Sequence, residues 1–159
     1  MISRIITLSK SVFLRFFLLG LALAFTQEPF NLPYWTFLVL PLASFLAIRF
    51  LKTPKQHLLG GFAFGLGYFG LTFIWIINPF LVDPQKNMWL VPFAYPLFIS
   101  LLSLFWALAF YISRYFMQDE QRNRDKVLCL SIVFATAELF RCYLFSGFPW
   151  AILSYAWLD

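Results

Sequence analysis

The chain of 159 residues is 62% hydrophobic and only 12% charged, with a mean hydropathy of +0.78. A soluble domain is typically about 45–50% apolar and about 25% charged, so this composition excludes an ordinary soluble domain and indicates an integral membrane protein. The net charge of +5 comes from short basic clusters between apolar runs rather than from one polar face. We interpret these clusters as topology determinants and expect no nucleic-acid partner.

The first two membrane spans are predicted near residues 11–30 and 34–51, because each run approaches the about 20 apolar residues that cross a bilayer. Arg15 lies near the inner end of the first run, where its side chain can snorkel to the interface. A cleaved signal peptide is the alternative for this run, since Ala22-Leu23-Ala24 has the small residues of a processing site. Prolines and interfacial aromatic residues between the two runs predict a turn that joins them as a hairpin.

Small residues dominate the first half of the third predicted span, near residues 58–80. Gly61 and Gly65 form a small-xxx-small pair, which allows another helix to approach closely. We interpret this face as a helix-packing surface, and the alternative is a surface shaped for a lipid chain. The span ends with the aromatic residue Trp75, which is typical of the membrane interface.

The fourth and fifth spans are predicted near residues 88–116 and 127–146. The fourth run is longer than a perpendicular crossing needs and carries Pro92 and Pro96 near its start, so we expect its first turns to lie in the interface or to kink. Ten of the twelve lysine and arginine residues fall at the N-terminal end or around the loops after the second and fourth spans. This bias predicts an all-α integral membrane protein with about five transmembrane helices, an inner N-terminus and an outer C-terminus.

The fifth span contains an acidic and a basic residue, Glu138 and Arg141, on one helical face. If the helix enters the bilayer near Val127, Glu138 is about 16 Å along it, near the midplane of a core about 30 Å thick. Charges at that depth are unfavourable, so we expect Glu138 to be protonated or paired with Arg141. Arg141 is expected to lie close enough to the outer face to snorkel. A structural ion pair that fixes helix packing is one interpretation, and a binding site is the other.

The run from Glu138 to Trp150 resembles a family signature. Gly147-Phe148-Pro149-Trp150 stops the helix at its outer end, with two aromatic side chains at the level of the lipid headgroups. A Glu, an Arg and a Gly-Phe-Pro-Trp turn at this spacing are similar to the membrane part of bacterial apolipoprotein N-acyltransferases. The first hairpin and the glycine-rich third span resemble the same family more loosely.

The resemblance implies an enzyme of the bacterial inner membrane that moves an acyl chain from a phospholipid donor to the N-terminal cysteine of a diacylglyceryl apolipoprotein. It also implies a lipid site in which Arg141 holds the headgroup phosphate, because its planar guanidinium matches phosphate oxygens, and in which Glu138 orients Arg141. The other expected substrate-binding residues are Gly147, Phe148, Pro149, Trp150 and Trp75.

The resemblance further implies that the chemistry belongs to a nitrilase-like Glu-Lys-Cys domain that follows the N-terminal helices, and residues 1–159 contain no such domain. Cys129 and Cys142 lie in the apolar fifth span with no lysine near them on the outer side, and His57 has no metal-binding partners nearby in the sequence. We therefore expect a truncated form, a split form or a fragment that has no catalytic residues, is inactive alone and binds no cofactor or metal.

Two other classes of function fit the composition. One is a small non-catalytic membrane scaffold or partner subunit, which would use the glycine-rich third span as its contact surface. The other is part of a transporter with Glu138 and Arg141 on its pathway, although the sequence shows no inverted repeat.

Overall fold

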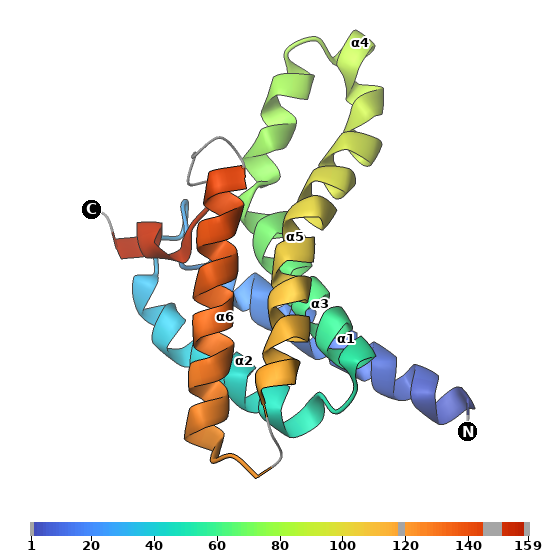
Figure 1. Cartoon of the computed structure of the whole chain (residues 1–159). Helices are drawn as coiled ribbons and strands as arrows, with labels where there is room; N and C mark the ends of the chain where they lie inside the picture. Colours follow the sequence, from blue (N-terminus) through green and yellow to red (C-terminus); the bar gives the residue numbers. More distant parts are fainter. Residues whose placement is uncertain (1, 118–119, 145–150, 158–159) are drawn as a thin grey trace.

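The computed structural model describes residues 2–117, 120–144 and 151–157, and these residues form helices and turns without a β-strand (Figure 1). In chain order, the α-helices are α1 (Ile2–Ala24), α2 (Thr36–Phe50), α3 (Pro54–Thr72), α4 (Pro84–Asn87), α5 (Val91–Phe116) and α6 (Asn123–Leu144). The 3-10 helices are η1 (Pro33–Trp35), η2 (Ile74–Leu81), η3 (Met88–Leu90) and η4 (Leu153–Trp157). The predicted all-α fold class is confirmed.

Several of these helices are long and apolar enough to cross a membrane. Within the described residues, three stretches meet this condition, namely Pro33–Phe50, Pro84–Phe116 and Asn123–Leu144. A fourth crossing results if α3 and η2, which are bent by 48° relative to each other, form one span. The protein is therefore a helical membrane protein, and the number of five spans and their orientation stay predictions.

The helix ends differ from the predicted span ends. The sequence predicts a first span over 11–30, but α1 ends at Ala24, and backbone hydrogen bonds such as Asn31 N to Gln27 O (3.0 Å) form a turn after it. The predicted third span is divided at Phe73, where η2 replaces the α-helix. The predicted fourth span begins with η3 and is preceded by α4, so the continuous helical stretch starts at Pro84.

The start of α3 is encoded by three residues within one turn, Thr53, Pro54 and Gln56. Thr53 Oγ1 accepts a hydrogen bond from Gln56 N at 3.3 Å, and Gln56 Oε1 accepts one from Thr53 N at 3.2 Å. This capping box satisfies N–H groups that the first turn of a helix leaves without partners. Pro54 occupies the first helical position, where its missing N–H is not needed. The turn between α2 and α3 is therefore tight.

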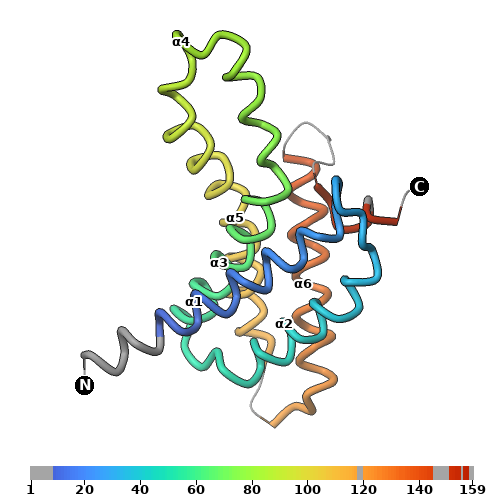
Figure 2. The backbone as a smooth tube through the Cα atoms, turned by 180° about the vertical axis from the view of Figure 1, so that it is seen from behind, coloured from blue at the N-terminus to red at the C-terminus, as the bar shows by residue number. Residues whose placement is uncertain are grey.

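α3 lies between α1 and α5 and packs closely against both helices (Figure 2). A Cβ atom added at Gly67 would lie 2.2 Å from the Phe17 carbonyl oxygen of α1. One added at Gly61 would lie 2.5 Å from the Trp106 carbonyl oxygen of α5. Only glycine permits such a close approach of the backbones, so the interpretation of this face as a helix-packing surface is confirmed.

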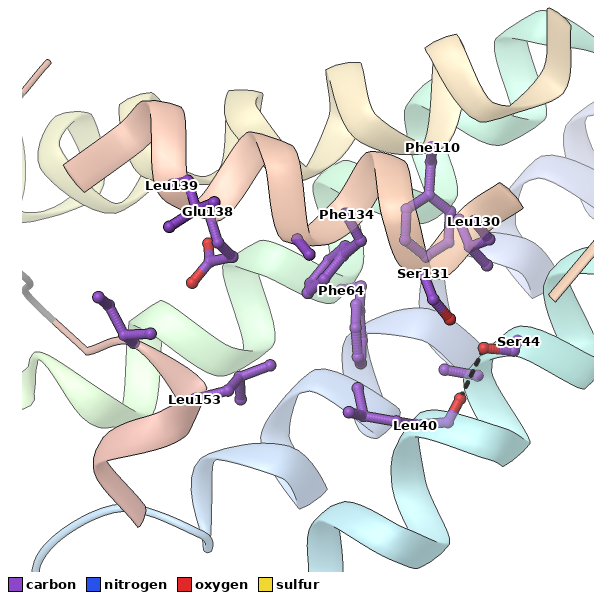
Figure 3. Close-up of a pocket in the computed structure, with 13 residues that line it drawn as sticks. Leu40, Ser44, Phe64, Phe110, Leu130, Ser131, Phe134, Glu138, Leu139 and Leu153 are labelled. Atoms are coloured by element: carbon purple, nitrogen blue, oxygen red, sulfur yellow. Dashed lines mark hydrogen bonds between the residues drawn. The ribbon is translucent and has the colours of Figure 1, made fainter. Parts of the chain in front are cut away.

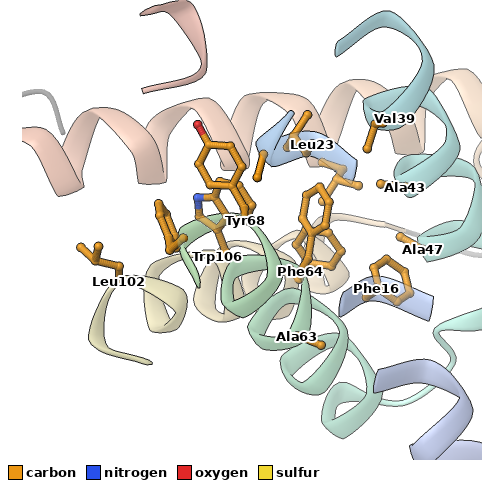
Figure 4. Packing of buried hydrophobic residues seen from close by; sticks show 14 of the residues in the cluster. Phe16, Leu23, Val39, Ala43, Ala47, Ala63, Phe64, Tyr68, Leu102 and Trp106 are labelled. Atoms are coloured by element: carbon orange, nitrogen blue, oxygen red, sulfur yellow. The ribbon is translucent and has the colours of Figure 1, made fainter. Parts of the chain in front are cut away.

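Trp106 of α5 lies at the centre of a buried aromatic core (Figure 4). Its ring centroid is 4.8–5.0 Å from the ring centroids of Phe64, Tyr68, Phe69 and Phe134. Tilted and offset rings at these distances stabilise a core beyond the effect of apolar burial alone. Because the four neighbours belong to α3 and α6, this core joins three helices.

The two basic loops lie at the same end of the molecule (Figures 1 and 2). The turn between α2 and α3 and the connection between α5 and α6 are both at the lower end of Figure 1, whereas the hairpin around α4 projects at the opposite end. Arg15 is exposed, and its guanidinium carbon lies 4.8 Å from the ring centroid of Phe50, close to the first of these turns. The predicted topology needs both basic loops on one side of the membrane, and their position at one end of the molecule is compatible with it.

Candidate functional site

Glu138 and Arg141 both point from α6 into the protein, since residues three apart share a helical face. Their exposed fractions are 7% and 2%. Arg141 Nη2 donates a hydrogen bond to Glu138 Oε2 at 3.0 Å, and Arg141 Nε donates one to Oε1 at 3.1 Å. The predicted ion pair is confirmed. The expectation that Arg141 snorkels to the outer face is wrong, because its guanidinium stays inside the protein beside the carboxylate.

The carboxylate of Glu138 has a further partner on α5. Trp106 Nε1 donates a hydrogen bond of 2.7 Å to Glu138 Oε1, so three donated hydrogen bonds reach the two carboxylate oxygens. A buried charge is tolerated where it is both paired and hydrogen-bonded in this way. Glu138 therefore connects α5 to α6 through a polar contact inside an otherwise aromatic core.

Arg141 extends the same network to α3 and to the C-terminal segment. Its guanidinium carbon lies 5.2 Å from the ring centroid of Phe69, a distance at which a cation is attracted to an aromatic face. Its Nη2 also donates a hydrogen bond of 3.5 Å to the carbonyl oxygen of Ala151. Tyr68 Oη donates to the same carbonyl at 3.1 Å. The Ala151 carbonyl is thus the point where α3 and α6 both hold the chain that follows.

The C-terminal segment, residues 151–157, lies against the start of α2. The ring of Trp157 contacts the rings of Tyr34 and Phe37 at centroid distances of 5.6 and 5.4 Å. Ala156 is buried, with 4% of its surface exposed. Ala151 has a φ of 48°, which a residue with a side chain adopts at some energetic expense. The polar network and these aromatic contacts together keep the segment in place.

A cavity of about 460 Å³ lies beside Glu138, between α2 and α6 (Figure 3). It is partly open to the surroundings of the protein. The lining consists of Leu40, Ala43, Ser44, Phe64, Phe110, Leu130, Ser131, Phe134, Ala135, Glu138, Leu139, Ile152 and Leu153. Almost all of these side chains are apolar, so the cavity suits an apolar ligand with Glu138 near one of its ends.

The structure brings together two of the predicted site residues. Glu138 and Arg141 form the network described above, and Glu138 also lines the cavity. Trp75 lies on η2, half exposed, with its ring 6.5 Å from that of Phe73, and the described cavity lining does not include it. The predicted turn Gly147-Phe148-Pro149-Trp150 lies outside the described residues.

Two residues of the candidate site, Tyr68 and Trp106, are not predicted from the sequence. Both are fully buried aromatic residues with one polar atom, in spans that are otherwise apolar. Buried Tyr and Trp side chains usually find a hydrogen-bond partner, and this tendency was the available signal. The sequence does not indicate which groups these side chains bind, because Trp106 is 32 residues from Glu138 and Tyr68 is 83 residues from Ala151.

The described part of the chain offers no metal centre. No group of three or more His, Cys, Asp or Glu side chains among these residues could hold a metal ion. His57 Nδ1 lies 3.0 Å from the Thr53 carbonyl oxygen in the first turn of α3, so the ring contacts its own helix start.

Comparison with known proteins establishes the family. Residues 19–159 match the family model of the apolipoprotein N-acyltransferase N-terminal domain. The chain belongs to this family. Apolipoprotein N-acyltransferases of Sinorhizobium fredii and Brucella suis are 32% and 34% identical to the chain over 148 residues, and that of Rhodopseudomonas palustris is 31% identical over 143 residues.

The aligned regions cover 87–88% of this chain but only 26–27% of the three relatives. The chain therefore spans about a quarter of the length of the apolipoprotein N-acyltransferases that it matches. The predicted resemblance is confirmed, and it concerns the N-terminal domain of the family. Glu138, Arg141, Tyr68, Trp106 and all the residues that line the cavity fall inside the matched range.

Proposed function

We propose that this chain is the membrane part of an apolipoprotein N-acyltransferase of the bacterial inner membrane. The observation that carries the proposal is the match of residues 19–159 to the N-terminal domain of that family. In this function, an acyl chain passes from a phospholipid donor to the N-terminal cysteine of a diacylglyceryl apolipoprotein. The apolar helices keep the domain in the membrane, where the phospholipid donor is available.

We further propose that the Glu138–Arg141 network belongs to the binding site of the donor. The guanidinium matches phosphate oxygens, and Glu138 and Phe69 fix its plane. Phe69 and Trp106 cover the network from α3 and α5, and Arg141 is buried, so a headgroup would reach its guanidinium only by displacing the Ala151 carbonyl of the C-terminal segment. Trp75 and the turn Gly147–Trp150 would bind the lipid at the membrane interface.

The covalent step requires groups outside residues 1–159. Acyl transfer through a thioester needs a cysteine thiolate beside a base, in a partly exposed and electropositive setting. Cys129 and Cys142 both lie on α6, a helix that is apolar enough to cross the membrane. Lys126 is near the opposite end of that helix from Cys142. A nitrilase-like domain would supply the catalytic residues, and residues 1–159 alone would be inactive.

The structure argues against the alternative that the chain is a non-catalytic scaffold. It requires that the glycine-rich face of α3 remain available to another protein. Gly67 instead contacts the backbone of α1, and Gly61 contacts the backbone of α5. This face is therefore already filled within the chain, and the acyltransferase function is the better supported one.

A domain exchange tests the proposed function. The matching N-terminal domain of the Brucella suis relative is replaced by residues 1–159, and the purified chimera is given a phospholipid with a radiolabelled acyl chain and a diacylated lipopeptide. We expect labelled lipopeptide from the chimera and none from residues 1–159 alone. Transfer by the isolated chain would show that it holds its own catalytic groups.

Substitutions in the chimera test the site. Arg141→Lys keeps the positive charge but removes the planar guanidinium, so we expect the rate of acyl transfer to fall. Arg122→Lys, in the exposed loop before α6, should leave that rate unchanged. Size-exclusion chromatography checks that each variant is folded. A folded chimera without transfer would refute the proposed function, and unchanged transfer in Arg141→Lys would remove Arg141 from the binding site.

A further inference from the structure

The cavity between α2 and α6 is a partly open groove with several small residues in its walls. On α6, Ser131, Ala135 and Leu139 follow one another at intervals of four residues, are exposed, and line the groove. Ala43 and Ser44 of α2 line the facing wall, and Figure 3 shows Ser44 opposite Ser131. Small residues let the backbone of another helix approach closely within a membrane. The walls therefore have the composition of a helix-packing surface.

The groove makes few polar demands on an occupant. The Ser44 hydroxyl already donates a hydrogen bond to the Leu40 carbonyl oxygen at 2.9 Å. The Glu138 carboxylate is neutralised by Arg141 and also accepts a hydrogen bond from Trp106. Because these groups already have partners, an apolar occupant covers them without the cost of an unpaired buried polar group.

The size of the groove matches one face of a helix. Its lining follows α6 from Leu130 to Leu139, which is about 13 Å at about 1.5 Å per residue. A helix packed along this length presents three side chains on one face, at positions i, i+3 or i+4, and i+7. An apolar cavity of about 150 Å³ holds one benzene ring, so the groove of about 460 Å³ holds about three side chains of that size. Length and volume thus agree on three apolar side chains.

The packing of α2 leaves room for a further helix. Three of its fifteen residues are buried, namely Val39, Ala43 and Ala47. In α3, nine of nineteen residues are buried. Helices in a membrane associate through close packing rather than through the hydrophobic effect. A helix in the groove would therefore add to α2 the packing contacts that α3 already has.

The C-terminal segment lies at one end of the groove. Ile152 and Leu153 line this end, and the ring of Trp157 contacts Tyr34 and Phe37 near the start of α2. Consecutive helices are usually neighbours in space and are joined by short connections. The region that the relatives share with this chain is only 26–27% of their length. Sequence that continues from Trp157 in a longer chain starts beside the groove.

We propose that this groove is the docking site of a transmembrane helix from the remaining part of the acyltransferase. The helix enters at the end formed by Ile152 and Leu153, runs antiparallel to α6, and places three apolar side chains of one face into the groove. The source of the helix rests on the proposed function, in which this chain is one part of a longer enzyme.

Photo-crosslinking within the chimera tests the docking site. Benzoylphenylalanine is placed in turn at Leu139, at Ser131 and, as a control, at Ile132, an exposed residue of α6 outside the lining. The chimera is illuminated in phospholipid vesicles, and peptide mass spectrometry maps the adducts. We expect the first two probes to capture one apolar stretch of the Brucella suis part, and the probe at Ile132 to capture lipid.

The same adducts report the direction of the helix. Leu139 and Ser131 are eight residues apart on α6. Because both helices rise by about 1.5 Å per residue, the probe at Leu139 should capture a residue about eight positions N-terminal to the one captured from Ser131. The reverse order would overturn the antiparallel orientation.

Two variants without a photoprobe provide a matched comparison. Tagged residues 1–159 are co-expressed with the remainder of the Brucella suis relative and purified by the tag. Ala135→Phe places a ring in the groove from an exposed lining position, and Ile132→Phe adds one at an exposed position outside it. Overpacking a close contact is unfavourable, so we expect Ala135→Phe to lower the copurified amount about tenfold and Ile132→Phe to leave it unchanged.

Three outcomes would overturn the docking site. These are adducts only to lipid from Leu139 and Ser131, adducts that join two copies of the chimera, and equal copurification with Ala135→Phe and Ile132→Phe. Neither measurement needs turnover. Adducts in a chimera without transfer would therefore refute only the proposed function, and transfer by a chimera without these adducts would refute only the docking site.

Discussion

At the scale of single residues, Glu138 is the centre of the polar network, because both Arg141 and Trp106 donate to its carboxylate. Glu138→Ala would leave a buried cation without a counter-ion and a buried N–H without an acceptor. Arg141→Ala would leave an acid that can bind a proton and keep its hydrogen bond to Trp106. Breaking a buried pair costs about 3–5 kcal/mol, so we expect Glu138→Ala near the upper value and Arg141→Ala below it.

Chemical denaturation of the two purified variants in detergent measures this difference as the free energy of unfolding. Glu138→Gln is the control for shape, since it keeps a hydrogen-bond acceptor but removes the charge. It should fall between the wild type and Glu138→Ala. If Arg141→Ala proved the less stable of the two alanine variants, the carboxylate would not be the centre of the network.

Tyr68 acts on a different part of the same network, because its hydroxyl holds the Ala151 carbonyl. We expect Tyr68→Phe to loosen the C-terminal segment, so that chymotrypsin cleaves faster within residues 151–157 while the helices stay intact. Tyr95→Phe is a matched control, since Tyr95 donates to the Gly70 carbonyl oxygen, away from that segment. Equal cleavage rates in the two variants would show that the Tyr68 hydroxyl does not hold the segment.

At the scale of helices, the crossing of α1 and α3 depends on close backbone contacts at two glycines, Gly20 of α1 and Gly67 of α3. Gly67→Ala places a Cβ atom 2.2 Å from the Phe17 carbonyl oxygen, so the helices must separate, and overpacking of this kind costs about 1–3 kcal/mol. Gly70→Ala meets its nearest neighbour, Ile99, only at 3.8 Å and gains up to about 1 kcal/mol of helix propensity. We expect a lower melting temperature in the first variant and an unchanged or higher one in the second.

Thermal unfolding in detergent, followed by tryptophan fluorescence, distinguishes these two alanine variants. Both variants add one Cβ atom to a glycine of α3, so the gain in intrinsic helix propensity is the same in both. A melting temperature of Gly67→Ala equal to that of Gly70→Ala would mean that α1 does not pack on α3 as described.

At the scale of the whole molecule, the basic residues around the two loops at one end predict that this end faces the cytoplasm. Fusions of a topology reporter after Lys52, Gln85, Gln121 and Asp159 should report inside, outside, inside and outside. An inside signal at Asp159 would refute the predicted outer C-terminus.

The residues of the candidate site were predictable only in part. Glu138 and Arg141 were identified because charged residues stand out in an apolar helix, and their pairing followed from a spacing of three residues. The burial of Arg141 was not predicted, since depth along one helix does not tell which neighbouring helices cover it. Tyr68 and Trp106 reach the network from other helices, and their partners are 83 and 32 residues away.

By itself, the sequence determined the membrane class, the helical fold, the packing face of α3 and the ion pair of α6. These properties depend on composition, on helical periodicity and on the energetic cost of charges in lipid, all of which act along a short stretch of chain. Only the tertiary structure decided the cavity between α2 and α6 and the anchoring of the segment after α6. Both depend on side chains from distant parts of the chain, which come together only when α3 has packed against α1 and α5.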